Sequence, residues 1–461
     1  MNPYLRLLAR PFQYYFPYSF KHSKEFYQWL DFVNTSQWDT PEAIAAYQWT
    51  QVKKMLDHCY ANVPYYSALF KRLNAHPDDF RSLADYEQFP LLTRQHVREH
   101  YQDMIATNID PAVINTYNTG GSTGIPLKIF GIKSDNTIEQ AFIANQWARV
   151  NFKPKDRVIL LRGDVVPDGK LWQYRPSSNS WIFSSYHLSP VFIADMVKKI
   201  NKIKPKYLHV YPSSLWVFAN LMKEQDLHFN FKLTAVLCGS EKLFDFQRDF
   251  VESYYGTKCY SWLGLGEQTI LAGECEHSKN LHAFPQYSYN ELIDQDERII
   301  RKPHISGEIV GTTLHKYVFP LMRYKSGDLA SYAEGPCKCG RNFPLLEDVQ
   351  GRIQNMIVGS DNRLFPLTAV FFGQHLEAFN KVHKIQLEQS KAGIVSIKIV
   401  KGNNFDQQDE AKFKMQLLTS TDHKIDFSIH YCDDIERTNQ GKHKFLIQHL
   451  DVESFKFNQE D

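Results

Sequence analysis

The sequence has no long apolar run, no excess of charge of one sign, and few cysteines. None of its 461 residues falls in a stretch that approaches the ~20 consecutive apolar residues of a membrane-spanning helix. Lys and Arg number 53 and Asp and Glu 51, so the formal net charge is only +2 and the basic footprint of a nucleic-acid-binding protein is missing. The seven cysteines are an odd number in a long chain, which argues against a disulfide framework and predicts a reducing compartment, the cytoplasm.

The first twenty residues, MNPYLRLLARPFQYYFPYSF, lack a clean apolar core and a small-residue cleavage site. We therefore expect no secretory signal here. The segment is aromatic and basic, and we expect it to pack on the body of the protein. Peripheral contact with a membrane surface is the alternative that stays open.

The order of the patterns predicts an α/β protein of more than one domain, because 461 residues exceed one hydrophobic core. Residues up to about 110 are mainly helical, with Thr40 and Thr93 as N-caps. Next, strands alternate with helices and end in polar or glycine turns, as in layered α/β sheets that bind ligands beyond the strands' carboxyl ends. We expect a large N-terminal domain over residues 1–354 and a small, mobile α+β domain over residues 355–461.

The segment YNTGGSTGIPLKIF, residues 117–130, combines glycines, hydroxyl side chains and a strand-like ending. Glycines let a backbone approach a phosphate, and hydroxyls and amides can surround its oxygens. No Lys followed by Ser or Thr is present here, so a Walker-type ATPase is not supported. Taken alone, the segment fits a flexible turn as well as a phosphate-binding loop. The residues at its centre are Thr119, Gly120, Gly121, Ser122, Thr123 and Gly124.

Later segments give this loop a context, because together they resemble, in order, the motifs of the adenylate-forming enzymes. The resemblance spans about 325 residues and rests on TGGSTGIPL (119–127), GSE (239–241), LGLGE (263–267), YKSGDL (324–329), GRIQNMIVGSDNRLFP (351–366) and TNQGKHKF (438–445). The helical N-terminus, with VPYYSALF and FPLLTRQHVREH, and the segment YPSSL are similar to the phenylacetate–CoA ligase-like branch, nearest its CapK-type members.

The resemblance implies a role for each matching residue. The loop 119–124 would hold the ATP phosphates, the turn Gly239, Ser240 and Glu241 would lie beside adenine, and Gly264 and Glu267 would lie near the phosphates, with Glu267 supporting Mg²⁺. The remaining roles are ribose binding by Asp328, ribose or phosphate binding by Arg352, a hinge at Asn355 and a mobile catalytic lysine at Lys442. The chain departs from the family at Leu263 and Gly266, where the family has an aromatic residue and a threonine, and at Asn355, where it usually has Asp or Lys as the pivot.

Cysteine and histidine residues in CEHSKNLH and GPCKCGRN predict a structural Zn²⁺ site. Three thiolates and one imidazole satisfy tetrahedral zinc, and a closed set of four leaves no position for substrate. His277 competes with His282 as the fourth ligand. The predicted ligands are Cys275, His282, Cys337 and Cys339.

The resemblance implies that a carboxylate attacks ATP to give an acyl-adenylate, which then reacts with a thiol such as CoA or with an amine such as an amino sugar or amino acid. CapK-type relatives suggest a role in capsular or surface polysaccharide synthesis, and a non-catalytic nucleotide-binding scaffold is the alternative. We expect the acid near residues 162–190, 209–215 and 238–262, but the side chains there do not identify it: Arg162, Trp181, Tyr186, His187, His209, Tyr211 and Trp262.

Overall fold

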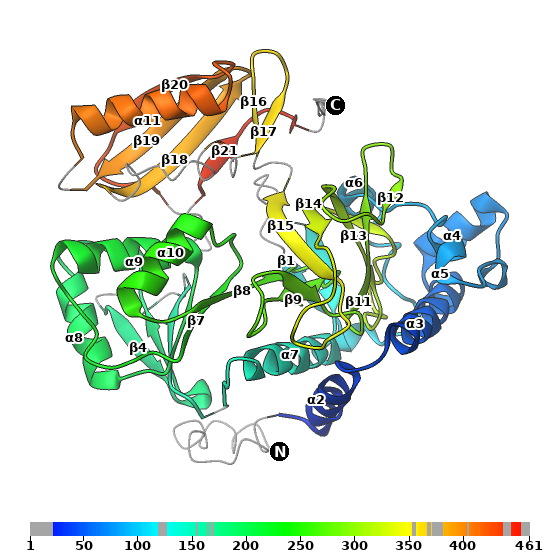
Figure 1. The fold of residues 1–461 in the computed structure, drawn as a ribbon. Helices are drawn as coiled ribbons and strands as arrows, with labels where there is room; N and C mark the ends of the chain where they lie inside the picture. The colour runs from blue at the N-terminus through cyan, green and yellow to red at the C-terminus, as the bar shows by residue number, and fades with distance from the viewer. Residues whose placement is uncertain are drawn as a thin grey trace. The chain divides into compact units, whose positions relative to one another are not determined.

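The structure is a computed structural model, and it divides into two compact units. It describes residues 22–118, 127–153, 155–162, 164, 166, 170–352, 356–366, 370, 381–402, 405–436 and 444–452. Unit 1 takes its described residues from 153–261 and 353–461, and unit 2 from 17–152 and 262–352. The predicted domain boundary between residues 354 and 355 stays a prediction. The α/β fold class is confirmed (Figure 1).

The core of unit 1 is a mainly parallel sheet. Its strands β7 (Ala235–Gly239), β6 (Tyr207–Val210), β3 (Val158–Leu161) and β5 (Ser180–Phe183) are parallel neighbours in that order, and β4 (Trp172–Arg175) pairs antiparallel with β5 at the edge. These strands are largely buried runs of mainly aliphatic residues, as expected for a sheet covered on both faces.

Helices follow the strands of this sheet, as the alternating pattern predicts. They are α8 (Ile193–Ile203), α9 (Pro212–Glu224) and α10 (Asp245–Tyr255), seen in green beside the strands in Figure 1. Helix α8 buries Ile193, Met196, Val197, Ile200 and Ile203, which recur at the spacing of one helix face. The apolar stripe explains why this segment folds as a helix against the sheet.

The C-terminal part of unit 1 contains a four-stranded sheet in the order β20-β19-β18-β21. The strands are β18 (Val382–Lys391), β19 (Ile394–Lys401), β20 (Asp426–Tyr431) and β21 (Leu446–Gln448). Helix α11 (Gln407–Ser420) lies along this sheet (Figure 1), and a hairpin of β16 (Met356–Val358) and β17 (Leu364–Pro366) precedes it. The α+β character predicted for this segment is confirmed.

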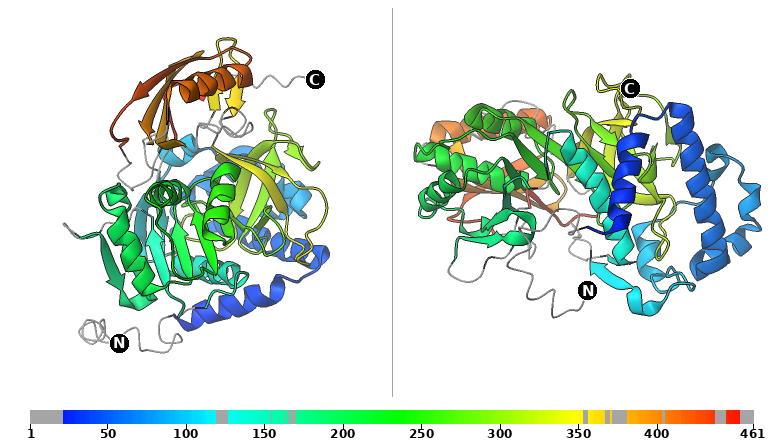
Figure 2. Two further views of the ribbon diagram at one scale, coloured as in Figure 1. Left: turned by 60° about the vertical axis from the view of Figure 1, so that its left-hand side comes forward. Right: turned by 90° about the horizontal axis from the view of Figure 1, so that it is seen from below.

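Unit 2 begins with helices. They are α2 (Lys24–Ser36), α3 (Pro41–Asn62), α4 (Pro64–Leu73), α5 (Leu83–Tyr86) and α6 (Arg94–Glu99), followed by α7 (Lys133–Ala148). Both predicted caps are confirmed, because Thr40 accepts the N–H of Ala43 and Thr93 that of His96. Helix α2 packs along α7, dark blue beside teal in Figure 2.

The remainder of unit 2 is an antiparallel sheet in the order β12-β11-β13-β14-β15-β10-β9, with the end of β8 pairing with β9. The strands are β8 (Cys259–Gly264), β9 (Leu271–Gly273), β10 (Leu281–Ala283), β11 (Ser288–Ile293), β12 (Ile299–Ile300), β13 (Gly307–Thr313), β14 (Tyr324–Tyr332) and β15 (Leu345–Arg352). A separate hairpin joins β1 (Asn115–Asn118) to β2 (Lys128–Gly131). Among the helices described, none is long and apolar enough to cross a bilayer.

Candidate functional site

Part of the predicted nucleotide site lies outside the described residues: the loop 119–124, Asn355 and Lys442. The described strands that flank the loop, β1 and β2, pair so that Asn118 stands opposite Lys128. Arg352 ends β15, but its side chain is also outside the description. The roles of all these residues stay predictions, as do the roles of the site residues described below.

Glu267 lies in the tight turn between β8 and β9. The turn is closed by the N–H of Gln268, which donates to the carbonyl of Leu265 at 2.9 Å, and the side chain of Glu267 is buried. Its Oε1 lies 3.5 Å from a guanidinium nitrogen of Arg94, the first residue of α6. A β-carbon at Gly264 would lie 3.3 Å from the side chain of Leu271, so even alanine would require that side chain to move by a few tenths of an ångström.

Sequence reasoning missed a buried lysine that faces Glu267. Burial lowers the pKa of Lys316 to about 8, while the carboxylates of Asp135, Glu139 and Glu267 oppose this effect. Burial likewise raises the pKa of Asp135 and of Glu139. Glu139 also accepts a hydrogen bond at 3.0 Å from Gln268, the neighbour of Glu267. Glu267 is therefore tied into a buried set of charges of both signs.

Asp328, the predicted ribose ligand, is buried in strand β14. The antiparallel register with β15 places it directly opposite Arg352, so the two residues predicted to bind ribose or phosphate are neighbours in the sheet. The preceding Gly327 has φ +78°, a conformation that favours glycine, and its N–H donates to Glu308 at 2.9 Å. The turn-like backbone explains why a Gly-Asp pair occurs inside a strand.

The turn Gly239–Glu241 stands at the carboxyl end of β7 in unit 1. Ser240 has φ +67°, in the left-handed region, and its hydroxyl accepts a hydrogen bond from Arg162 at 2.9 Å. Glu241 accepts the N–H of Ser213, near the start of α9, at 3.0 Å. The guanidinium of Arg162 also lies over the ring of Tyr211, 5.2 Å from its centroid.

The polar residues that we expected around the acid do not all gather at this turn. His209 is buried behind it in β6, and burial, followed by the charge of Arg162, lowers its pKa well below the usual value. Trp181 instead packs beside Tyr174, with the amine of Lys199 over its ring. Arg162 therefore contacts the turn, Tyr211 and His209 interact with Arg162, and Trp181 has other partners.

The four residues predicted to bind zinc lie together in unit 2, with their ligand atoms all within 4.8 Å of one another. The sulfurs of Cys275 and Cys337 are 3.6 Å apart, and the Sγ of Cys339 is 3.2 Å from the Nε2 of His282. Tetrahedral zinc, with ligand bonds of about 2.0–2.3 Å, separates such atoms by roughly 3.5–3.8 Å. The cluster has the ligand types and the spacing that Zn²⁺ requires.

The surroundings of the cluster support the same set of ligands. The Nδ1 of His282 lies 3.2 Å from the carbonyl of Asn280, which leaves Nε2 to face the thiols. Burial lowers the pKa of His282 to about 4, which keeps the imidazole neutral. His277, the competing residue, gives its backbone N–H to Cys275, and its ring is not among the clustered ligand atoms.

The pKa values of two of the thiols shift in opposite directions. Burial raises the pKa of Cys275 to about 12. Burial also acts to raise the pKa of Cys339, but hydrogen bonds from the backbone and side chain of Arg341 overcome this effect, and the pKa of this thiol falls. Two buried guanidiniums, those of Arg149 and Arg341, lie near the sulfurs and favour thiolates.

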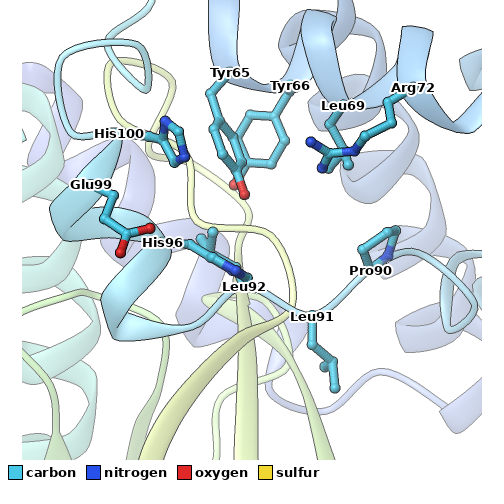
Figure 3. Close-up of a pocket in the computed structure, with 10 residues that line it drawn as sticks. All are labelled: Tyr65, Tyr66, Leu69, Arg72, Pro90, Leu91, Leu92, His96, Glu99 and His100. Carbon is cyan, nitrogen blue, oxygen red and sulfur yellow. The ribbon is translucent and has the colours of Figure 1, made fainter.

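A separate pocket of about 270 Å³ lies between α4, α6 and the segment that joins α5 to α6 (Figure 3). It shares no residue with the predicted nucleotide or zinc sites. Its lining residues are Tyr65, Tyr66, Leu69, Arg72, Pro90, Leu91, Leu92, His96, Glu99 and His100.

Comparison with known proteins gives the chain its relatives. Residues 363–449 match the family model of the CapK C-terminal domain. The phenylacetate-coenzyme A ligase of Escherichia coli is 25% identical over 346 residues, which cover 73% of this chain and 77% of the relative. The enzyme of the same name from Aromatoleum evansii is 24% identical over 425 residues, covering 88% and 94%, and protein CapK of Staphylococcus aureus is 22% identical over 404 residues, covering 84% and 86%.

A solved structure shows the same fold. The 2-hydroxyisobutyryl-CoA ligase in the postadenylation state, in complex with 2-HIB-AMP, aligns with a TM-score of 0.70 at 17% identity, covering 89% of this chain and 90% of the ligase. The predicted resemblance is therefore confirmed: the chain is a relative of phenylacetate–CoA ligases and of CapK and has the fold of an adenylate-forming ligase.

Proposed function

We propose that this relative of the phenylacetate–CoA ligases is an ATP-dependent, AMP-forming ligase that activates a carboxylic acid and transfers its acyl group to CoA. The observation that carries the proposal is the placement of Glu267 and Asp328 as two buried carboxylates in unit 2, at positions that match the family motifs for magnesium and ribose. The named activities of several relatives support the same chemistry.

The proposed reaction begins with attack of the substrate carboxylate on the α-phosphorus of ATP, which forms the acyl-adenylate and releases pyrophosphate. Stabilising the charge that gathers on the phosphate oxygens is the main task of the protein in such a step. The loop 119–124 would surround the β- and γ-phosphates, the ribose would bind at Asp328, and Lys442 would bridge the carboxylate and the α-phosphate. Rotation about Asn355 would then remove Lys442 and admit the acceptor.

The surroundings of Glu267 fit a magnesium ion that arrives with ATP. Mg²⁺ prefers oxygen ligands and is usually bound by one or two carboxylates together with substrate phosphates. Glu267 offers such an oxygen, and the 3.5 Å contact with Arg94 is long for a charge-assisted hydrogen bond. Bound Mg²⁺ would neutralise the phosphates, and in its absence the nearby cations Arg94 and Lys316 would balance the charge of the Glu267 carboxylate.

The cluster of Cys275, His282, Cys337 and Cys339 would hold a structural Zn²⁺ ion. Its four ligands form a closed set, which leaves no position for substrate. The ion would join the turn after β9 to the segment between β14 and β15.

An amine acceptor, an amino sugar or an amino acid, is the second candidate, and the similarity to CapK favours it, together with a role in surface polysaccharide synthesis. A non-catalytic nucleotide-binding scaffold is the other alternative, motivated by Leu263 and Gly266 at positions where the family motif has an aromatic residue and a threonine.

ATP–pyrophosphate exchange with aryl, fatty, amino and uronic acids tests the proposal. We expect exchange with one class of acid. In Lys442→Ala the exchange rate should fall by a factor on the order of 10²–10³, because the removal of one positioned charge-stabilising group has an effect of this size. Lys444→Ala, two residues along, is the matched control and keeps its activity. CoA-dependent release of AMP then separates a thioester product from an amide. Nucleotide binding without exchange for any acid would favour the scaffold.

A further inference from the structure

Arg162 is a half-buried cation at the carboxyl edge of the parallel sheet in unit 1. It follows β3 directly, just as Tyr211 follows β6 and Ser240 follows β7. The parallel register pairs Leu161 with Val210, and Val210 with Cys238, so the residues after the three strands share one edge. This is the edge where ligands bind in open α/β sheets.

The contacts of Arg162 leave much of its hydrogen-bonding capacity unused. One terminal nitrogen donates to the hydroxyl of Ser240 at 2.9 Å, and the guanidinium lies over the ring of Tyr211. Its Nε is buried and has no hydrogen-bond partner within the described residues. A guanidinium carries five N–H donors in a planar fork that matches a carboxylate or a phosphate.

The acidic residues nearest to Arg162 are bound elsewhere. Asp164 forms an ion pair with Arg175 at 3.2 Å, and Glu241 accepts the backbone N–H of Ser213. In the described part of the chain, no carboxylate lies within the 4.0 Å of an ion pair with Arg162. Both acids attract Arg162 only at longer range, and burial outweighs them, so the pKa of this guanidinium is lowered.

The start of helix α9 at the same edge is a second feature that favours an anion. This helix of 13 residues follows Tyr211, which makes no side-chain cap, so the chain itself neutralises only part of its positive end. Glu241 takes one of its N–H groups. The hydroxyl of Ser213 is buried without a hydrogen-bond partner among the described residues and is a further donor.

We propose that Arg162 recognises a second anionic group on the acid that is activated, so that the substrate class is a dianionic acid bearing an additional carboxylate or phosphate. The proposal rests on the proposed function and names the substrate class of that site. The carboxyl group that reacts with ATP is one anion, and the group held by Arg162 is the other. A purely structural role, in which Arg162 only supports the left-handed turn at Ser240, is the competing explanation.

Matched pairs of acids test the proposal in the exchange assay: butyrate against succinate, phenylacetate against 2-carboxyphenylacetate, and glycerate against 3-phosphoglycerate. In the wild type we expect kcat/KM to be at least about tenfold higher for the dianionic member of one pair, because only that member can form charge-assisted hydrogen bonds with Arg162 through its second anionic group. Arg162→Met should remove this preference mainly through KM, and Arg162→Lys should retain part of it. The third pair distinguishes a phosphate from a second carboxylate.

Thermal stabilisation by the same acids without ATP keeps the two proposals separable. Arg298→Met, which removes an exposed arginine from unit 2, is the control for general charge. One outcome is that a dianionic acid raises the melting temperature of the wild type but not of Arg162→Met, while neither protein catalyses exchange. That result would overturn the proposed ligase activity and keep the recognition of dianions by Arg162. A second outcome is that the wild type catalyses exchange with the same kcat/KM for both acids of every pair, or that Arg162→Met lowers kcat/KM equally for both. Either result would overturn the role of Arg162 and leave the ligase activity standing.

Discussion

Unit 2 contains two sites suited to a metal ion, and they differ in what surrounds the ligand atoms before a metal binds. In the cluster of Cys275, His282, Cys337 and Cys339, four ligand atoms already lie together. At Glu267, the chain places Arg94 3.5 Å from the carboxylate, and the charge of Lys316 acts on it from a longer distance. The first arrangement suits an ion that stays for the life of the protein. The second suits a magnesium ion that arrives with each nucleotide and leaves with the product.

Two consecutive residues, His315 and Lys316, show how burial acts on bases of different intrinsic pKa. Burial lowers the pKa of both His315 and Lys316, to about 4 and about 8. The imidazole faces the carbonyl of Gln286 and is neutral at pH 7, whereas the ammonium faces three carboxylates and keeps its charge. Both pKa values fall by a similar amount from their usual values of 6.5 and 10.5, so the higher intrinsic pKa of lysine is what leaves Lys316 charged while His315 is neutral.

Loss of zinc should have the largest effect. Cys339→Ser is expected to purify without zinc and to lose at least about 4 kcal/mol of unfolding free energy, because metal binding by a closed site contributes directly to folding. Metal analysis and urea unfolding under reducing conditions measure the two quantities. Cys432→Ser, which changes a partly buried cysteine of unit 1, is the control and should cost about 1 kcal/mol or less. If the wild type contains no zinc and its unfolding free energy does not change when a chelator is added, the cluster does not hold a resident metal ion. The contrast between the two sites would then be wrong.

The features that could be predicted from the sequence are those that depend on residues close together in the chain. Thr40 before Pro41 marks a helix start because capping is a local interaction. The Cys-x-Cys pair lies with the other two predicted ligands, as expected, while the zinc ion itself stays a prediction. The pairing of Arg94 with Glu267 and the charges around Lys316 join residues that are far apart in the chain. Such contacts produce no regular spacing in the sequence from which they could be predicted. The loop 119–124 and Lys442 rest on family resemblance alone, since they lie outside the described residues.

Removal of the buried lysine should have the next largest effect. Lys316→Met is expected to cost about 3 kcal/mol of unfolding free energy, because it leaves Asp135, Glu139 and Glu267 without their cation in a buried setting. The matched control is Lys325→Met, which removes a more accessible lysine paired with Glu297 at 3.1 Å and should cost about 1 kcal/mol. Urea unfolding compares them. Adding Glu139→Gln should restore part of the loss, and no recovery would show that Lys316 stabilises by packing alone.

The neutral state of His315 should appear as a dependence of stability on pH. Its pKa is about 4 in the folded protein and about 6.5 in the unfolded chain, so the unfolded chain binds the proton more readily. The stabilising contribution is present above pH 6.5 and is lost as the pH falls toward 4, by up to about 3 kcal/mol. The difference in unfolding free energy between wild type and His315→Gln, measured from pH 7 to pH 4, isolates this effect. A constant difference would show that folding does not lower the pKa of this imidazole.

Weakening the contact between Arg94 and Glu267 should give the smallest change and tests whether the chain's cation competes with magnesium. Arg94→Met is expected to lower the Mg²⁺ concentration for half-maximal exchange about threefold, since a partly exposed ion pair contributes less than about 1 kcal/mol. The rate at saturating Mg²⁺ should change little, because Glu267 remains in its turn. Arg98→Met on the same helix is the control for charge and should leave the Mg²⁺ requirement unchanged. A higher Mg²⁺ requirement in Arg94→Met would reverse the interpretation: Arg94 would then orient Glu267 for the metal, and both metal sites of unit 2 would be preorganised by their neighbours.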